Sequence, residues 1–389
     1  MVKTRSKSEA ETSPRESKKS KQEPLTPIPP TPPRQKKIST ASLSPEDPEI
    51  STLLNEFLQT STGPIAPIAT AFRDGIASSK NGISSLDIVR RPTHLWTSLM
   101  LLKPLILPSE TTWELMPPSY EVFVNELISS YTKSSINVYT VGKPLEPAGD
   151  DAFVRCIWQL QEPDPECTYY AINIPTDTAK MKLPDWLKIT GVPYGKQMTT
   201  TNITPRHTFV DLHIDHGRHG ITTVFGPCIK LWALYPPTPH NLSLYSSAVA
   251  SSTPFTSLSP QLEGGEFCIT TLKDTLYLPP GCLHATYTLR GGLTPGFEYT
   301  TGDCLEVGAQ ILAINKRRFR LGPGDYEPFL EAVVSAFRGG VKESEEAERK
   351  LCVFYKVVAK QKGKVAAEIR KLTKGRPCKG CGRMWKAHL

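Results

Sequence analysis

The residues best suited to chemistry lie in residues 207–235, HTFVDLHIDHGRHGITTVFGPCIKLWALY. Near the start of this segment apolar and polar residues alternate, which is the two-residue period of a β-strand. That period predicts His213 and Asp215 on one face of the strand, where an imidazole and a carboxylate can grip one metal ion. A third ligand must come from elsewhere, and His284 is the candidate because it opens a strand directly after a Pro-Pro-Gly turn.

Two histidines and one carboxylate form the facial triad of non-heme Fe(II) oxygenases, which leaves three coordination positions open. Two of these positions can take a bidentate oxo acid, and the third can take O₂. Two other interpretations fit the same residue types. The histidines can be satisfied side chains of ordinary strands, since chance alone supplies a His-x-Asp tripeptide. A site of two histidines and one aspartate can also hold zinc for hydrolysis.

The surroundings of these residues resemble the JmjC (Jumonji C) family of Fe(II)- and 2-oxoglutarate-dependent dioxygenases. In that family a His-x-Asp strand is followed by a Lys-aromatic strand that ends in proline, and then by a Pro-Gly-aromatic-x-His strand. The same order occurs here within residues 165–302, as His213-Ile214-Asp215, as Lys230-Leu231-Trp232 with Tyr235-Pro236-Pro237, and as Pro280-Gly281-Cys282-Leu283-His284.

The resemblance implies a role for each matching residue. The iron ligands would be His213, Asp215 and His284. Lys230 would pair with the distal carboxylate of 2-oxoglutarate, and a lysine that points into a β-barrel does need an anionic partner, because an unpaired buried ammonium is costly. Thr223 lies ten residues after His213, where the family often has a polar side chain near the co-substrate. An ordinary strand threonine is the other interpretation of Thr223.

The sequence departs from the family pattern before the last ligand and adds two histidines near the first. Cys282 and Leu283 stand where the family commonly has an aromatic residue, which leaves the shape of the pocket open. His216 would face the other way on a continuing strand, and His219 lies in a glycine-rich turn. Both histidines are competing ligands by residue type, and we expect both to be exposed loop residues.

The mechanism that the resemblance implies is oxidative. Fe(II) binds 2-oxoglutarate and O₂, the co-substrate is decarboxylated to succinate, and a C–H bond of a protein substrate is hydroxylated. Hydroxylation of an N-methyl-lysine releases formaldehyde and so demethylates the substrate, for example a histone, whereas hydroxylation of a side-chain carbon is stable. The alternatives are a non-catalytic JmjC-fold module for chromatin or protein interaction, and another metal-binding cupin-like protein.

A second group of metal-ligand residue types lies in residues 375–389, GRPCKGCGRMWKAHL. Cys378-x-x-Cys381 followed by His388 has the spacing of a zinc site. A structural zinc site normally closes with four ligands, so Cys352 or a partner chain would have to supply the fourth. A basic tail with two free thiols is the other interpretation.

The pattern along the chain predicts five regions. Residues 1–48 form a disordered, basic, Ser/Pro-rich tail, since such a composition cannot bury enough apolar surface to fold. Residues 49–150 form a mostly helical region, in which the apolar run 95–107 is a buried helix with its end. Residues 151–303 form the β domain, residues 304–374 a helical region, and residues 375–389 the Cys-x-x-Cys tail.

The β domain is expected to position the candidate ligands. Short apolar runs between prolines and glycines predict strands at 169–174, 207–214, 229–235, 266–272, 275–278 and 284–289. Residues 246–262 are rich in Ser, Thr and Pro and predict a surface loop. The composition favours a mainly β core with helical flanks, and the resemblance implies a double-stranded β-helix, which is a cupin-like jelly roll.

Charge is distributed unevenly over the 389 residues, which carry 46 Lys and Arg against 38 Asp and Glu. Residues 1–40 have a net charge of +6 and residues 341–389 of +9, which leaves −7 for residues 41–340. An acidic body suits a cationic protein substrate such as a basic tail, while the basic ends suit nuclear import or contact with nucleic acid. We expect the nucleus, or otherwise the cytosol.

Membrane insertion and secretion are not expected. No apolar run approaches the roughly 18 residues of a membrane span. The N-terminal residues show no apolar stretch behind their charges, unlike a secretory signal. Nine cysteines, an odd number spread over a long chain, are typical of reduced thiols rather than of a disulfide framework.

Overall fold

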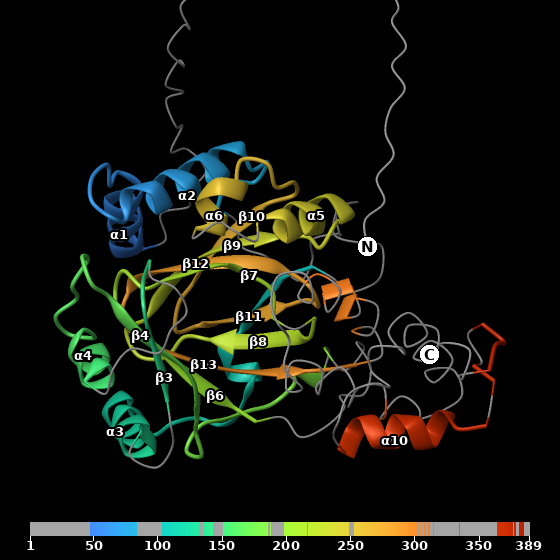
Figure 1. Ribbon diagram of the computed structural model, residues 1–389. Coiled ribbons are helices and arrows are strands. Elements are labelled where there is room, and N and C mark those ends of the chain that lie inside the picture. The colour runs from blue at the N-terminus through green and yellow to red at the C-terminus, as the bar shows by residue number, and fades with distance from the viewer. Residues whose placement is uncertain are drawn as a thin grey trace, which may run out of the picture. The chain divides into compact units, whose positions relative to one another are not determined.

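The computed structural model describes most of the chain from Asp47 to Tyr299 and shorter stretches beyond it (Figure 1). The described residues are 47–83, 103–131, 136–142, 151–185, 187, 198–215, 217–248, 253–301, 304, 307–308, 310–311, 314, 334, 364–375, 377–378 and 381–384. The predicted disordered tail, apart from its last two residues, lies outside them, as does most of the predicted helical region 304–374.

The described residues form mainly antiparallel β-sheet with few helices. The larger sheet has the strand order β1-β11-β8-β13-β6-β4-β3, with β1 Leu105–Pro108, β3 Asn137–Thr140, β4 Tyr169–Pro175, β6 Thr200–Thr204, β8 His219–Thr223, β11 Asp274–Leu278 and β13 Gly292–Tyr299. The smaller sheet has the order β10-β9-β12-β7, with β7 Phe209–His213, β9 Ile229–Tyr235, β10 Glu266–Thr270 and β12 Leu283–Arg290. A separate pair joins β2 (Trp113–Leu115) to β5 (Lys180–Met181).

The two larger sheets pack face to face, and β9 shows how. All seven of its residues are buried, as expected for a central strand that is covered on both faces. Trp232 and Leu234 pack with Leu276 and Leu278 of the larger sheet. Leu231, Ala233 and Tyr235 face the other way and pack against helices. We call the space between the two sheets the inter-sheet interior. Its lining alternates along each strand with residues that face outward.

Helices cover the outer faces of the sheets (Figure 1). The outer core of the smaller sheet contains residues of α1 (Pro48–Leu58), α2 (Ala66–Ser78), α5 (Pro239–Ser247) and α6 (Pro254–Leu258). The outer core of the larger sheet contains residues of α3 (Tyr120–Tyr131) and α4 (Ala152–Trp158). A 3-10 turn η1 spans Ser109–Thr111, and α10 spans Lys364–Thr373. No helix in the described part of the chain is long and apolar enough to cross a membrane.

The strands lie at the predicted runs, but two local predictions are wrong. Residues 105–107 belong to strand β1, not to the end of a helix, because β1 pairs with β11 about 170 residues later, a contact that a local pattern does not reveal. The rest of that predicted helix, residues 95–102, lies outside the described residues. The insertion 246–262 is not only a surface loop. It contains α6, whose Phe255 and Leu258 are spaced three residues apart and are buried against the smaller sheet. Residues 49–150 also supply β2 and β3 besides their helices.

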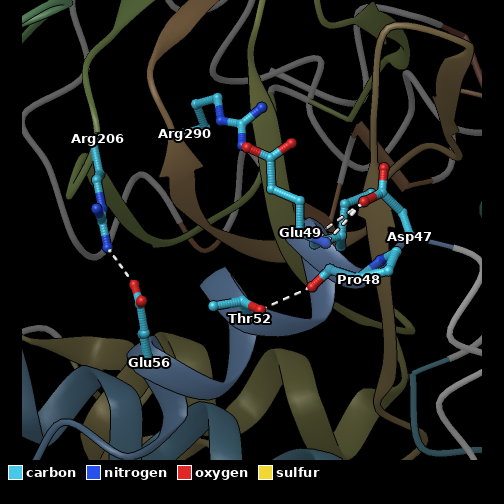
Figure 2. A network of polar contacts seen from close by, with 8 residues as sticks. Asp47, Pro48, Glu49, Thr52, Glu56, Arg206 and Arg290 are labelled. Atoms are coloured by element: carbon cyan, nitrogen blue, oxygen red, sulfur yellow. Dashed lines mark hydrogen bonds and ion pairs between the residues drawn. The ribbon is translucent and has the colours of Figure 1, made fainter.

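Helix α1 is fastened to the smaller sheet by one aromatic contact and two ion pairs. The ring of Phe57 stacks on Tyr287 of β12, with ring centroids 3.8 Å apart. Glu56 binds Arg206 at 3.1 Å, and Glu49 binds Arg290 (Figure 2). Asp47 caps the helix by accepting the backbone N–H of Glu49. The buried ring should therefore contribute much more to stability than the exposed ion pairs.

Phe57→Ala is expected to lower the free energy of unfolding by about 3 to 4 kcal/mol, because it removes a buried ring and leaves a cavity. Glu49→Gln, which breaks an exposed ion pair of the same helix, is expected to lower it by less than about 1 kcal/mol. Urea unfolding of the two variants measures both values. Equal losses of unfolding free energy in the two variants would show that the ion pair contributes as much to stability as the buried ring, and would contradict the prediction.

Candidate metal centre

The structure brings His213, Asp215 and His284 together at one end of the smaller sheet. His213 ends β7 and lies opposite His284, the second residue of β12. Asp215 Oδ1 lies 3.4 Å from His213 Nε2, and Asp215 Oδ2 lies 3.4 Å from His284 Nε2. One ligand atom from each residue falls within 4.8 Å of the others, so the triad could hold a metal ion.

Backbone carbonyls fix how both imidazoles are turned. His213 Nδ1 donates to the carbonyl oxygen of Asp211 at 2.8 Å, and His284 Nδ1 donates to that of Cys282 at 3.1 Å. A carbonyl oxygen only accepts hydrogen bonds, so each Nδ1 carries the hydrogen. In the neutral form of each imidazole, Nε2 therefore presents a lone pair toward the aspartate, which is the orientation that metal-binding histidines need.

A β-bulge in β7 turns His213 into the inter-sheet interior. Between the pair His213–His284 and the next registered pair, β7 advances by three residues and β12 by two. Phe209 faces the helix-covered core, so strict alternation would have turned His213 toward the same core. The extra residue, at 211–212, reverses this. The strand then ends at His213, so Asp215 lies in the following turn and not on the strand as predicted.

The two imidazoles differ in their affinity for a proton. Burial first, and then the charge of the neighbouring His213, lower the pKa of His284 to about 4. Burial also lowers the pKa of His213, but its hydrogen bond to Asp215 and the charge of that carboxylate outweigh burial and leave the pKa raised. A metal ion needs neutral imidazoles, so a metal that binds here displaces any proton on His213.

The centre is open on one side. The side chains of His213 and Asp215 are 35% and 31% exposed, whereas that of His284 is 4% exposed. A buried ligand backed by the smaller sheet and two half-buried ligands leave one side of the centre accessible. A metal held there can keep coordination positions for other molecules.

Lys230 lies on the same interior face as His284. Along β9 it pairs with Thr288 of β12, four residues beyond His284, and its side chain is almost wholly buried. Its ammonium Nζ lies 5.5 Å from the centroid of the Trp232 ring, and that ring lies 6.2 Å from the ring of His284. Within the described residues no carboxylate pairs with this ammonium. The indole of Trp232 thus lies near both the lysine and the metal triad.

Two orphaned hydroxyls stand beside Lys230. Thr286 and Thr288 alternate with outward-facing residues of β12, so both face the interior with His284. Their Oγ1 atoms are buried and have no hydrogen-bond partner among the described residues. Burying a hydroxyl or an ammonium without a partner costs free energy. An anionic ligand with several oxygen atoms would satisfy these donors, so this end of the interior favours such a ligand. The residues present fit a carboxylate here and a metal at the triad.

The isolated charge of Lys230 predicts a pH-dependent cost to stability. Burial lowers its pKa from 10.5 to about 8, so the unfolded chain keeps the proton between those values while the folded chain loses it. Stability therefore rises with pH through that window, and the full cost, on the order of 3 kcal/mol, applies below pH 8. Without ligands, Lys230→Met should unfold at higher urea than the wild type at pH 7, by an amount that shrinks toward pH 10.

Lys273→Met, at an exposed lysine, is the matched control and should show no such window. If the difference in unfolding stability between wild type and Lys230→Met is the same at pH 7 and pH 10, the buried ammonium of Lys230 does not cause it.

The structure does not support the predicted role of Thr223. In β8, Ile221 faces the outer core of the larger sheet, and Thr223 shares its face. Thr223 Oγ1 donates to the backbone oxygen of Asp274 at 2.7 Å. Its neighbour Thr222 lies opposite Leu276, which is part of the interior. The polar side chain of β8 that faces the interior is thus one residue earlier than the sequence predicts.

The prediction that His219 is an exposed loop residue is wrong. His219 opens β8 and is fully buried on the outer face. Its nitrogens lie 2.8 Å from Tyr277 Oη and 2.9 Å from Thr301 Oγ1, and its ring stacks on Tyr299. Burial lowers its pKa to about 3, so it is a neutral structural residue. His216, the other predicted loop histidine, lies outside the described residues.

An ion pair beside the centre was not predicted from the sequence. Arg218 Nη1 lies 2.9 Å from Glu298 Oε2, and the backbone N–H of Arg218 donates to the oxygen of Asp215 at 3.0 Å. Burial first, and then the charge of Asp215, raises the pKa of Glu298 to about 7. The pair ties the turn that carries Asp215 to β13. The signal that could have revealed it is a lone acidic residue in the otherwise uncharged strand 292–299.

The predicted zinc site at the C-terminal end is described only in part. The backbone N–H of Gly382 donates to the oxygen of Cys378, and Pro377 pairs with Met384, so residues 377–378 lie beside residues 382–384. Cys378 is buried and Cys381 is exposed. His388 and Cys352 lie outside the described residues, so zinc binding by Cys378, Cys381 and His388 stays a prediction.

Comparison with known proteins adds no family to this geometry. A scan of the sequence against protein-family models finds no match, and a search of curated proteins finds none either. The resemblance to JmjC proteins stays a prediction from the sequence motifs.

Proposed function

We propose that this protein is an Fe(II)- and 2-oxoglutarate-dependent oxygenase of the JmjC type that acts on a protein substrate. The observation that carries the proposal is that the metal-binding triad and the isolated Lys230 share one interior face, with orphaned hydroxyls beside the lysine. Two facing antiparallel sheets with ligands on β7 and β12 agree with a double-stranded β-helix, the fold that the resemblance implies.

The chain's own residues have distinct tasks in this proposal. The triad holds the iron, and backbone carbonyls keep both Nε2 atoms turned toward it. Lys230 and Thr288 would hold a carboxylate of 2-oxoglutarate in the inter-sheet interior. Bound iron and 2-oxoglutarate supply the oxidising chemistry. The interior walls, including Trp232, exclude water from the reacting atoms.

The substrate is a protein side chain, either a methylated lysine that is demethylated or a carbon that is hydroxylated. The acidic body of the chain favours a basic segment such as a histone tail, and the basic termini favour the nucleus and contact with nucleic acid.

Succinate release tests the proposal. The full chain with Fe(II) and 2-oxoglutarate is expected to produce succinate, slowly without a substrate and faster with the right one. His213→Ala is expected to abolish this release, because it removes a metal ligand. Lys230→Ala is expected to lower the release strongly at low 2-oxoglutarate, because it removes the partner of the carboxylate. Wild-type release no higher than that of both variants would leave a non-catalytic JmjC-fold module. Metal-dependent hydrolysis that does not need Lys230 would instead indicate another cupin-like metalloprotein.

A further inference from the structure

A pocket of about 350 Å³ lies between α1 and the smaller sheet. Its walls come from four places: α1 with the turn that follows it, the loop before β4, the turn before β7, and β12. The residues that matter here are Glu56, Phe57, Gly63, Glu166, His207 and Tyr287. Segments far apart in the sequence thus enclose one space.

This pocket is separate from the metal centre. Its β12 residues, Tyr287 and Leu289, face the helix-covered core. His284 and Thr288 alternate with them and face the inter-sheet interior. The pocket and the metal centre therefore lie on opposite faces of the smaller sheet.

The inner wall is aromatic and held in a fixed shape. Phe57 stacks on Tyr287, and His207 Nδ1 lies 2.8 Å from Tyr287 Oη. His207 has a φ of 73°, in the left-handed region that side-chain-bearing residues seldom adopt. Such a conformation costs on the order of 1 to 3 kcal/mol, and it persists only where the surroundings enforce it.

The rim of the pocket carries a net negative charge. Glu56 and Arg206 neutralise each other in the ion pair of Figure 2. Glu166 adds a second carboxylate to the pocket lining, close to Gly63. No described side chain pairs with the Glu166 carboxylate. Burial lowers the pKa of His207 to about 4, so this histidine does not offset the charge near neutral pH.

We propose that this pocket binds a lysine or arginine side chain of a basic peptide segment. The aliphatic stem of such a side chain packs on the more accessible apolar residues of the lining, such as Leu53 and Pro64, outside the buried rings of Phe57 and Tyr287. Its cationic head lies near the Glu166 carboxylate. An acidic rim over an aromatic floor suits this occupant better than an acidic or an uncharged peptide. The site goes beyond the proposed oxygenase function and needs neither metal nor co-substrate.

Fluorescence anisotropy with short labelled peptides tests the site on the full chain, without iron or 2-oxoglutarate. The probes are heptapeptides in which alanine alternates with lysine, glutamate or serine. The lysine peptide is expected to bind, and Glu166→Lys is expected to weaken it by about tenfold or more, a change of about 1.4 kcal/mol or more. Thr62→Trp, at an exposed residue of the pocket rim, should block binding by filling the entrance.

Glu162→Lys is the matched control, since it reverses the same charge in the same loop but outside the pocket, and it should change the affinity by less than about twofold. The inference is overturned if the lysine peptide does not bind, if the glutamate or serine peptide binds equally well, or if both charge reversals weaken binding equally. None of these outcomes bears on succinate release, so the two proposals fail separately.

Discussion

His284→Ala is expected to lower the affinity of the protein for Fe(II), or for Mn(II) as a substitute that resists oxidation, by at least about 100-fold. His284 is the buried member of the triad, and its Nδ1 is already fixed by the carbonyl of Cys282. No other histidine among the described residues is placed to replace it, because His219 is buried on the outer face. Calorimetric titration of the full chain with Mn(II) measures the loss.

The matched control for this variant is His240→Ala. His240 is an exposed residue of α5, which packs on the outer face of the smaller sheet, whereas the triad lies on the inner face, so its removal should leave the metal affinity unchanged. Circular dichroism of both variants shows whether the sheets are intact. If a folded His284→Ala protein bound the metal as tightly as the wild type, His284 would not be a metal ligand.

Lys230→Ala is expected to raise the KM for 2-oxoglutarate by about 100-fold or more, because a buried, hydrogen-bonded charge pair is worth about 3 kcal/mol or more and each 1.4 kcal/mol is tenfold. Lys230→Arg should recover part of the affinity, since it keeps the charge but brings a larger and planar head into a closed space. Initial rates of succinate release at varied 2-oxoglutarate measure both effects.

Two threonines offer a matched pair for the same question. Thr288→Val removes the orphaned hydroxyl opposite Lys230 and should raise the KM by about tenfold, the worth of one hydrogen bond to a charged group. Thr223→Val makes the same change on the outer face and should leave the KM within about twofold. Equal effects, or a larger effect of Thr223→Val, would return Thr223 to the co-substrate site.

The sequence was sufficient to predict which residues meet, but not how they come to meet. Residue types and spacing predicted the triad of His213, Asp215 and His284, and a short run that is apolar except for Lys230 predicted β9. Strict alternation placed His213 and Asp215 on one strand face. The protein instead uses a bulge at 211–212 and a turn, which depend on the pairing of β7 with β12.

The errors have a common physical cause. The local surroundings of His219 are glycine-rich and indicate a loop, but hydrogen bonds to Tyr277 and Thr301, distant in sequence, bury it in β8. Thr223 was assigned by counting from His213, whereas its facing is set by the register of β8 against β11. The orphaned hydroxyls of β12 depend on the same kind of cross-strand registration. Long-range pairing of this kind is not encoded in a local pattern.

We propose that one dicarboxylate joins the metal triad to Lys230. Calorimetric titration of 2-oxoglutarate into the Mn(II)-loaded full chain tests it most directly, alongside the metal-free protein and the Mn(II)-loaded Lys230→Ala variant. We expect tight binding to the metal-loaded wild type and a loss of at least about tenfold in affinity in each of the other two samples. Binding of equal affinity in the metal-free protein or in Lys230→Ala would contradict the claim.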